Sequence, residues 1–124
     1  MLLLDTHAIL WFLNDDPKLP AEMKATIESE KNVYVSIASF WEIAIKESIG
    51  KLTIPAPVAQ LMEACEKIGF MILPIKADHL ALLKRLPKLH GDPFDRLLIC
   101  QANAEKMKLI TLDENIRKYD VPVL

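Results

Sequence analysis

Four acidic residues, widely separated along the chain, each follow a short apolar run or lie near the start of a helical pattern. They are Asp5, Glu42, Asp95 and Asp113. Carboxylates repel one another when they converge, unless a cation lies among them, and their oxygens are ligands that suit Mg²⁺ or Mn²⁺. If the fold brings these four together, they predict a divalent-metal site that lowers the pKa of a bound water.

The clearest of these positions lies in the stretch His90–Ile99, which is typical of the start of a helix. Asp92 is a good N-cap because its carboxylate accepts hydrogen bonds from free amides of the first turn, and Pro93 suits the first helical position. Beyond Asp95 the pattern is apolar on nearly every side, which predicts a buried helix. Asp95 is therefore expected at the mouth of the core, where the helix dipole favours its ionised form.

The other elements alternate between short apolar runs and helical patterns. Strands are expected at 2–4, 33–37, 70–73, 109–112 and 121–124, and helices at 7–13, 20–30, 39–49, after 57 to about 68, 77–86, 92–106 and 114–119. This alternation predicts an α/β fold in which a parallel sheet of about five strands has helices on both faces. Pro122 places the last strand at an edge. No repeat or composition break divides the chain, so a single domain over 1–124 is expected.

In sheets of this kind, ligands bind outside the carboxyl ends of the strands, and all four acids are expected on this rim. Each acid also has a purely structural explanation. Asp5 and Asp113 can cap the helices that follow them, and Glu42 can form a capping box with Ser39 or an ion pair with Lys46. Separate local explanations account poorly for four acids on the same rim, and we therefore favour a metal site.

The composition narrows the classes of function. The 124 residues carry a formal net charge of -2, which argues against a DNA-binding module with a broad basic face. A nuclease stays open, because bound cations supply positive charge locally. No apolar run approaches the ~20 residues of a membrane span, and the opening lacks the basic start of a signal peptide. Cys65 and Cys100 fall in apolar helical patterns, as expected of reduced core residues in a cytoplasmic protein.

Two other enzyme classes place acids at strand ends, and the chain departs from both. A response-regulator receiver domain needs an aspartate at the end of its third strand, where this chain has Leu73–Lys76. A phosphatase of the haloacid-dehalogenase type needs Asp-x-Asp after its first strand, where this chain has Asp5–His7. A scaffold or binding protein without nuclease activity stays open as the alternative, although an intact set of four acids speaks against it.

The ordered motifs of the chain resemble those of the PIN-domain ribonucleases, and most closely those of the VapC toxins of type II toxin–antitoxin pairs. The motifs that carry the resemblance are Leu2–His7, Ser36–Ile43, Asp92–Ile99 and Leu109–Asp113. The resemblance implies a three-layer α/β/α domain, a homodimer, and inhibition by a VapB-like antitoxin. It also implies hydrolysis of RNA with Mg²⁺ or Mn²⁺, leaving a 5′-phosphate and a 3′-hydroxyl.

Carried over position by position, the family's acidic quartet falls on Asp5, Glu42, Asp95 and Asp113. We expect Asp5 and Asp95 to bind the ion directly, and the other two to complete the site through water or at a weaker second metal. The role of Asp92 stays open between helix cap and support of the site. Arg96 is a candidate for contact with an RNA phosphate or for a pair with a neighbouring acid. The three histidines have no mutual spacing that suggests a site.

Overall fold

Four parallel strands form the sheet at the centre of the computed structural model, which describes residues 1–124. Their spatial order is β3-β2-β1-β4, with β1 at Leu2–Leu4, β2 at Val33–Ser36, β3 at Met71–Leu73 and β4 at Lys108–Ile110. In the register of the sheet, Leu3 lies between Tyr34 of β2 and Leu109 of β4. This sheet confirms the parallel α/β fold predicted from the alternation of elements.

The prediction of a fifth strand at 121–124 is wrong. The segment does run along the free edge of β4, as Pro122 suggested, but it makes only an isolated parallel bridge between Val123 and Leu109. Around this bridge the Leu109 amide donates to the Pro122 carbonyl at 2.8 Å, and the Leu124 amide donates to the Leu109 carbonyl at 3.1 Å. Proline has no amide hydrogen, so the ladder cannot continue through it.

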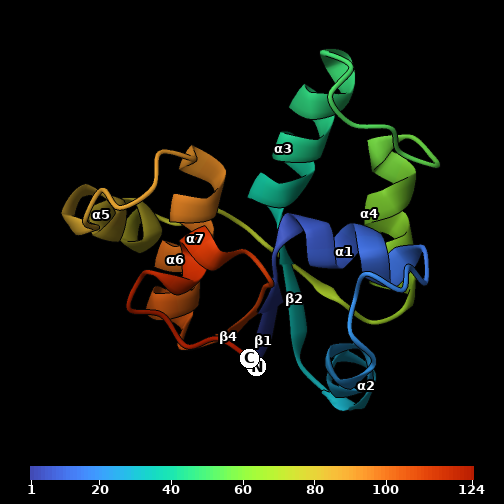
Figure 1. Ribbon diagram of the computed structural model, residues 1–124, viewed down its shortest axis with the longest axis horizontal. Helices are drawn as coiled ribbons and strands as arrows, with labels where there is room; N and C mark the ends of the chain where they lie inside the picture. The colour runs from blue at the N-terminus through green and yellow to red at the C-terminus, as the bar shows by residue number, and fades with distance from the viewer.

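Helices cover both faces of the sheet and complete three layers (Figure 1). They are α1 (Thr6–Leu13), α2 (Ala21–Ser29), α3 (Ile37–Ser48), α4 (Val58–Lys67), α5 (Ala77–Arg85), α6 (Pro93–Glu105) and α7 (Glu114–Arg117). In Figure 1, α1, α2 and α4 lie on one side of the sheet and α5, α6 and α7 on the other, while α3 rises from the end of β2. None of these helices has the length and apolar character needed to cross a membrane.

The alternation of side chains along β1 divides the core into two parts. Leu2 and Leu4 pack with residues of α1 to α4, whereas Leu3 points to the opposite face and packs with residues of α6 and α7. All three leucines are buried, because helices cover the strand on both sides. The carboxyl end of β1 is therefore held from both faces, and the residue that follows it, Asp5, has a fixed position.

His79 joins the start of α5 to the end of α6. Its ring is fully buried, with Nδ1 accepting from the Lys76 amide at 3.0 Å and Nε2 lying 2.8 Å from Oε2 of Glu105. Because Nδ1 is an acceptor, the ring proton is on Nε2 and is donated to Glu105. A metal ion at Nε2 would need the lone pair that this proton occupies. We therefore interpret the nearby acids Asp78 and Glu105 as structural neighbours of His79, not as metal ligands with it.

We expect His79→Ala to lower the free energy of unfolding by about 2–4 kcal/mol, because it leaves a cavity in the core and removes the hydrogen-bond partners of the Lys76 amide and of Glu105. Chemical denaturation followed by circular dichroism measures this change. The matched control is the exposed neighbour, Asp78→Ala, for which less than about 1 kcal/mol is expected. Equal effects of the two substitutions would contradict the role of His79 in joining the start of α5 to the end of α6.

Candidate metal centre

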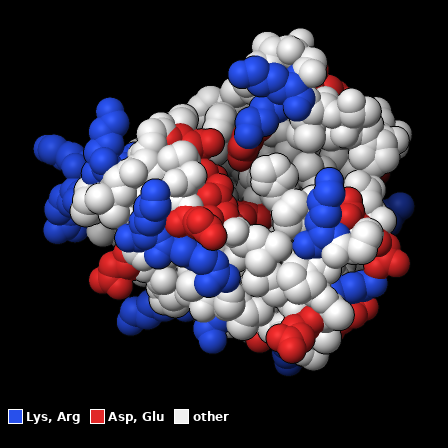
Figure 2. All heavy atoms as spheres, viewed as in Figure 1, with Lys and Arg blue, Asp and Glu red and all other residues white.

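The carboxyl end of the sheet carries a small cavity with no hydrophobic residue in its lining. Its volume is about 70 Å³, and its lining residues are Asp5, Thr6, His7, Glu42, Lys46, Asp92, Asp95 and Asp113. Figure 2 shows acidic side chains gathered in a hollow at the centre of this face, with basic side chains above them over α3. The structure thus brings together all four acids of the predicted quartet, and adds Asp92 to them. Their role as ligands stays a prediction.

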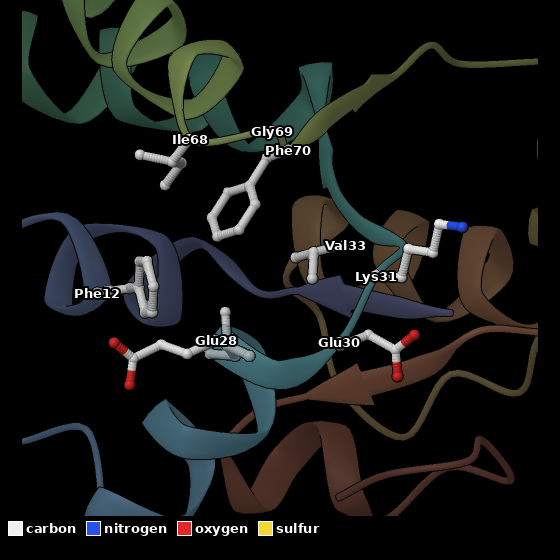
Figure 3. A pocket seen from close by; sticks show the side chains of 9 residues that line it. Phe12, Glu28, Glu30, Lys31, Val33, Ile68, Gly69 and Phe70 are labelled. Carbon is white, nitrogen blue, oxygen red and sulfur yellow. The ribbon is translucent and has the colours of Figure 1, made fainter.

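A larger cavity, of about 390 Å³, lies at the other end of the sheet (Figure 3). Phe12 and Phe70 line it with their rings tilted toward each other, with centroids 5.4 Å apart, and Val33 is at its base. Two carboxylates, Glu28 and Glu30, lie at its border and point away from each other in Figure 3. This cavity has volume without converging polar groups, so the smaller one is the candidate for chemistry.

Asp5 links β1 to α1 and is 5% exposed. Its Oδ1 accepts from the Ala8 amide at 2.8 Å, which confirms the expected N-cap, although α1 begins at Thr6, one residue earlier than expected. Burial raises the pKa of the Asp5 carboxyl, while hydrogen bonds from Thr111 and the Ala8 amide oppose the shift. The protein therefore holds this acid firmly but compensates its charge only in part.

Glu42 lies in the second turn of α3, not the first. The helix begins at Ile37, and the cap is Ser36, whose hydroxyl accepts from the Ala38 amide at 3.1 Å. The expected capping box between Ser39 and Glu42 is therefore wrong, because the serine at the end of β2 takes the cap three residues earlier. This shift frees the Glu42 side chain to turn toward the cavity.

Both carboxylate oxygens of Glu42 have partners inside the protein. The Thr6 hydroxyl donates to Oε1 at 2.6 Å, and Nζ of Lys46 donates to Oε2 at 2.5 Å. The second contact confirms the ion pair expected from the spacing of the two residues. Glu42 is 4% exposed, so this pair is at the border of the core and not on the open surface.

Asp95 and Asp92 meet at the start of α6. Oδ1 of Asp92 accepts from the Phe94 and Asp95 amides at 2.8 and 3.2 Å, which confirms the predicted cap. The pKa of Asp95 is raised to about 7, first by burial and then by the charges of Asp92, Asp113 and Glu42. The expectation that the helix dipole keeps Asp95 ionised is therefore wrong. Desolvation and three like charges outweigh a dipole effect of about 0.3–1 kcal/mol.

Asp113 completes the group and lies between the end of β4 and the start of α7. Its Oδ1 accepts from the Asn115 amide at 2.8 Å and caps α7, as predicted, while its own amide donates to Thr111 Oγ1 at 3.0 Å. Thr111 also bonds the Asp5 carboxylate, so one hydroxyl supports two of the acids. No motif pointed to Thr6 or Thr111. The only signal in the sequence was a threonine directly after Asp5 and another two residues before Asp113.

Arg96 lies outside the cavity and has other partners than those expected. Its guanidinium donates to the Leu86 and Pro87 carbonyls at 3.3 and 3.0 Å and to the Tyr119 hydroxyl at 3.2 Å. These bonds differ from both expected roles, a contact with an RNA phosphate and a pair with a neighbouring acid. Arg96 and Tyr119 instead fasten the loop between α5 and α6.

That loop places His90 against the acids, which spacing in the sequence did not predict. The Tyr119 hydroxyl accepts from the His90 amide at 2.8 Å, and His90 Nε2 lies 3.2 Å from Oδ2 of Asp95. His7, which also lines the cavity, stacks on Trp11 with ring centroids 5.5 Å apart. The third histidine, His79, serves the core. Two of the three histidines are therefore near the acids, despite having no motif spacing.

The donor set fits a hard divalent ion. Five of the eight lining residues are acids, and their oxygens are the ligand type that Mg²⁺ and Mn²⁺ take. The raised pKa values of Asp5 and Asp95 show that burial, and the charges of nearby acids, disfavour the ionised forms of these carboxyls. A cation bound at these acids would stabilise their ionised forms, which is the physical basis for a metal centre here.

A family model described as the PIN domain matches residues 2–122 of the chain. The chain belongs to the PIN-domain family. Among curated proteins, this PIN domain is 29% identical over 126 residues to ribonuclease VapC22 from Mycobacterium tuberculosis, a match that covers 98% of this chain and 93% of the relative.

Solved structures with the same fold include toxin–antitoxin complexes. A chain of VapBC2 from Rickettsia felis, bound to a DNA fragment from its promoter, superposes with a TM-score of 0.74 at 14% identity, over 99% of this PIN domain and 96% of that chain. A chain of FitAB bound to a DNA fragment superposes with a TM-score of 0.71 at 19% identity, over 100% of this PIN domain and 94% of that chain. A chain of a toxin–antitoxin complex from Klebsiella pneumoniae superposes with a TM-score of 0.62 at 18% identity, over 100% of this PIN domain and 96% of that chain. These likenesses confirm the fold expected from the resemblance.

The raised pKa of Asp95 predicts how the stability of the metal-free protein depends on pH. The folded state keeps a proton up to about pH 7 that the unfolded chain releases near its ordinary pKa of about 3.9. This contribution to stability is therefore full below about pH 4 and is lost as the pH rises through about 7. In EDTA, the melting temperature should fall between pH 5 and pH 8.

Asp95→Asn removes this titration while keeping the shape of the side chain. We expect the variant to melt at or above the parent temperature at pH 8 in EDTA, and to show a flatter pH profile. Thermal melts followed by circular dichroism measure both quantities. A variant that melts below the parent at pH 8 would mean that Asp95 stabilises the helix as an ordinary first-turn acid, and would contradict the repulsive arrangement.

Proposed function

We propose that this PIN domain, a single domain spanning 1–124, is a divalent-metal-dependent endoribonuclease and the toxin of a type II toxin–antitoxin pair. The observation that carries the proposal is the convergence of Asp5, Glu42, Asp95 and Asp113 in one cavity, where burial raises the pKa of Asp5 and Asp95. The ribonuclease VapC22 relative supports the substrate class, and the toxin–antitoxin neighbours support the biological role.

In this proposal, Asp5 and Asp95 hold Mg²⁺ or Mn²⁺ directly, while Glu42 and Asp113 complete the site through water. When bound, the ion lowers the pKa of a water molecule and offsets charge on the scissile phosphate. The protein's own part is to orient the acids. The Ala8 amide fixes one oxygen of Asp5, and the Thr6 hydroxyl fixes one oxygen of Glu42. Such support limits the motion of each carboxylate without an entropy cost at binding.

The first test is metal dependence of RNA cleavage. Cleavage should disappear in EDTA and return with Mg²⁺ or Mn²⁺, because in this mechanism the metal ion lowers the pKa of the attacking water. Asp95→Asn should lower the rate by at least about 100-fold, since asparagine lacks the charge that a hard cation needs. The control is Asp120→Asn, an exposed acid outside the cavity, which should cut at the parent rate. Full activity of the parent in EDTA would remove the metal mechanism.

The alternative is a PIN-fold scaffold or binding protein without nuclease activity. A plain interaction module should show no specific divalent site, whereas the proposed nuclease should bind Mn²⁺ at the cavity acids. Titration of Mn²⁺ into the purified protein separates the two, because binding should be saturable and should be lost in Asp5→Asn. The presence of a small neighbouring reading frame that encodes a DNA-binding partner would support the toxin role independently.

The proposed partners are RNA, a VapB-like antitoxin and a second copy of the chain, in the cytoplasm. An antitoxin that reaches an acidic cavity does so most simply with an Arg or Lys side chain, which makes a charge-assisted contact. Two exposed apolar residues, Trp41 on α3 and Ile49 at the C-cap of that helix, offer contacts for wrapping by the same partner or for the dimer.

We expect a basic side chain of the antitoxin to enter the cavity and compete with the metal ion. Asp5→Asn combined with Asp95→Asn should therefore weaken inhibitor binding and reduce its dependence on salt, because the charge pair is lost. Binding isotherms at about 50 and about 300 mM salt, which change the screening length roughly 2.4-fold, measure this effect. Unchanged affinity and unchanged salt dependence would show that inhibition comes from hydrophobic wrapping alone.

A further inference from the structure

Lys46 is the only lysine or arginine among the residues that line the acidic cavity. It follows Glu42 by one helical turn on α3, and its Nζ donates to Oε2 of Glu42 at 2.5 Å. An exposed pair at this spacing is an ordinary surface feature of little consequence. Here, however, the Glu42 side chain is only 5% exposed, and the cavity holds four further acids.

Both carboxylate oxygens of Glu42 already accept a hydrogen bond, Oε1 from Thr6 and Oε2 from Lys46. A metal ion bound to Oε2 would lie within a few ångströms of the Lys46 ammonium, and the two positive charges would repel each other. Thr6 is itself buried beneath the cavity and belongs to α1, which fixes the other side of the carboxylate. The Glu42 side of the cavity therefore already contains a cation, and the chain itself supplies it.

The charge of Lys46 also acts on acids beyond its direct partner. The pKa of Lys46 is raised, first by its hydrogen bond to Glu42 and further by the charges of Asp92 and Asp95. The ammonium thus lies within the field of the α6 acids as well as that of Glu42. Two-metal sites hold their ions about 3.5–4 Å apart, so a second ion at Glu42 would have to share the small cavity with this ammonium.

We propose that the ammonium of Lys46 takes the place of a second metal ion, so that this PIN domain binds one divalent ion, on the side of the cavity formed by Asp5, Asp95 and Asp113. The inference rests on the proposed metal-dependent function. It adds that the positive charge next to Glu42 is covalently part of the chain. Removal of Lys46 should then open a second ion site at Glu42 and strengthen the first one.

The experiment counts bound Mn²⁺ by the loss of the free-ion signal in electron paramagnetic resonance. The wild-type protein should bind one ion. Lys46→Gln should bind two, with a dissociation constant for the first ion lowered by about tenfold, because a unit positive charge a few ångströms away is gone. Lys46→Arg keeps the charge and should bind one ion. Lys51→Gln, which removes an exposed lysine beyond the end of α3, should match the wild type in count and affinity.

Thermal melts of the same samples add a readout that needs no metal in the reference state. In EDTA, Lys46→Gln should melt below the wild type, because Glu42 loses its counter-ion, and saturating Mn²⁺ should raise its melting temperature more than that of the wild type. If Lys46 is only a surface pair, both the metal-free melt and the Mn²⁺ response of Lys46→Gln will equal those of the wild type.

The outcomes separate this inference from the proposed function. A wild-type count of two ions, or a Lys46→Gln protein with unchanged count and affinity, would overturn the role of Lys46 and leave the metal-dependent nuclease intact. A wild-type protein that binds no Mn²⁺ would overturn the proposed function itself. If Lys46→Gln does not fold, Lys46→Met also removes the charge and takes its place. A Lys46→Met protein with an unchanged count and affinity would overturn the proposal, as would a Lys46→Arg protein with two ions.

Discussion

Repulsion among crowded carboxylates is the constraint on which the rest of this structure depends. Five acids border one cavity of about 70 Å³. Burial, followed by the charges of the neighbouring acids, raises the pKa of Asp95 to about 7, beyond what the dipole of α6 can offset. Such an arrangement persists only because the hydrophobic packing on both faces of β1 holds the strand ends in place. The stability of the core thus compensates for strain at the site, as is common where function needs a particular charge.

The same hydrogen bonds that begin the helices also orient the acids. Asp5, Asp92 and Asp113 each cap the helix that follows them, so one oxygen of each carboxylate is held by a backbone amide while the side chain borders the cavity. The structural and functional explanations of these residues are therefore not alternatives. A carboxylate with one oxygen fixed by a cap and a second directed to the cavity has lost the freedom that metal binding would otherwise remove.

Basic and aromatic side chains around the acids show where a pattern of residues is a poor guide. Arg96 neighbours Asp95 in the sequence, yet its guanidinium turns away to bind carbonyls of the loop between α5 and α6. His90, which has no motif spacing, is brought to Asp95 by the bonds of that loop to Tyr119. On a helix, adjacent residues diverge by about 100°, so a neighbour in sequence lies on a different face.

Local sequence patterns were sufficient to predict the parallel α/β fold, three of the helix caps and the gathering of the quartet at one rim. These follow from local chemistry: apolar runs form buried strands, and aspartates accept from free amides wherever a helix begins. Three features emerged only with the folded chain: Ser36 takes the cap expected of Ser39, 121–124 makes a single bridge, and Asp95 has a raised pKa. The tertiary fold also set the partners of Lys46 and Arg96. Burial and long-range charge depend on residues distant in sequence, and no local pattern contains them.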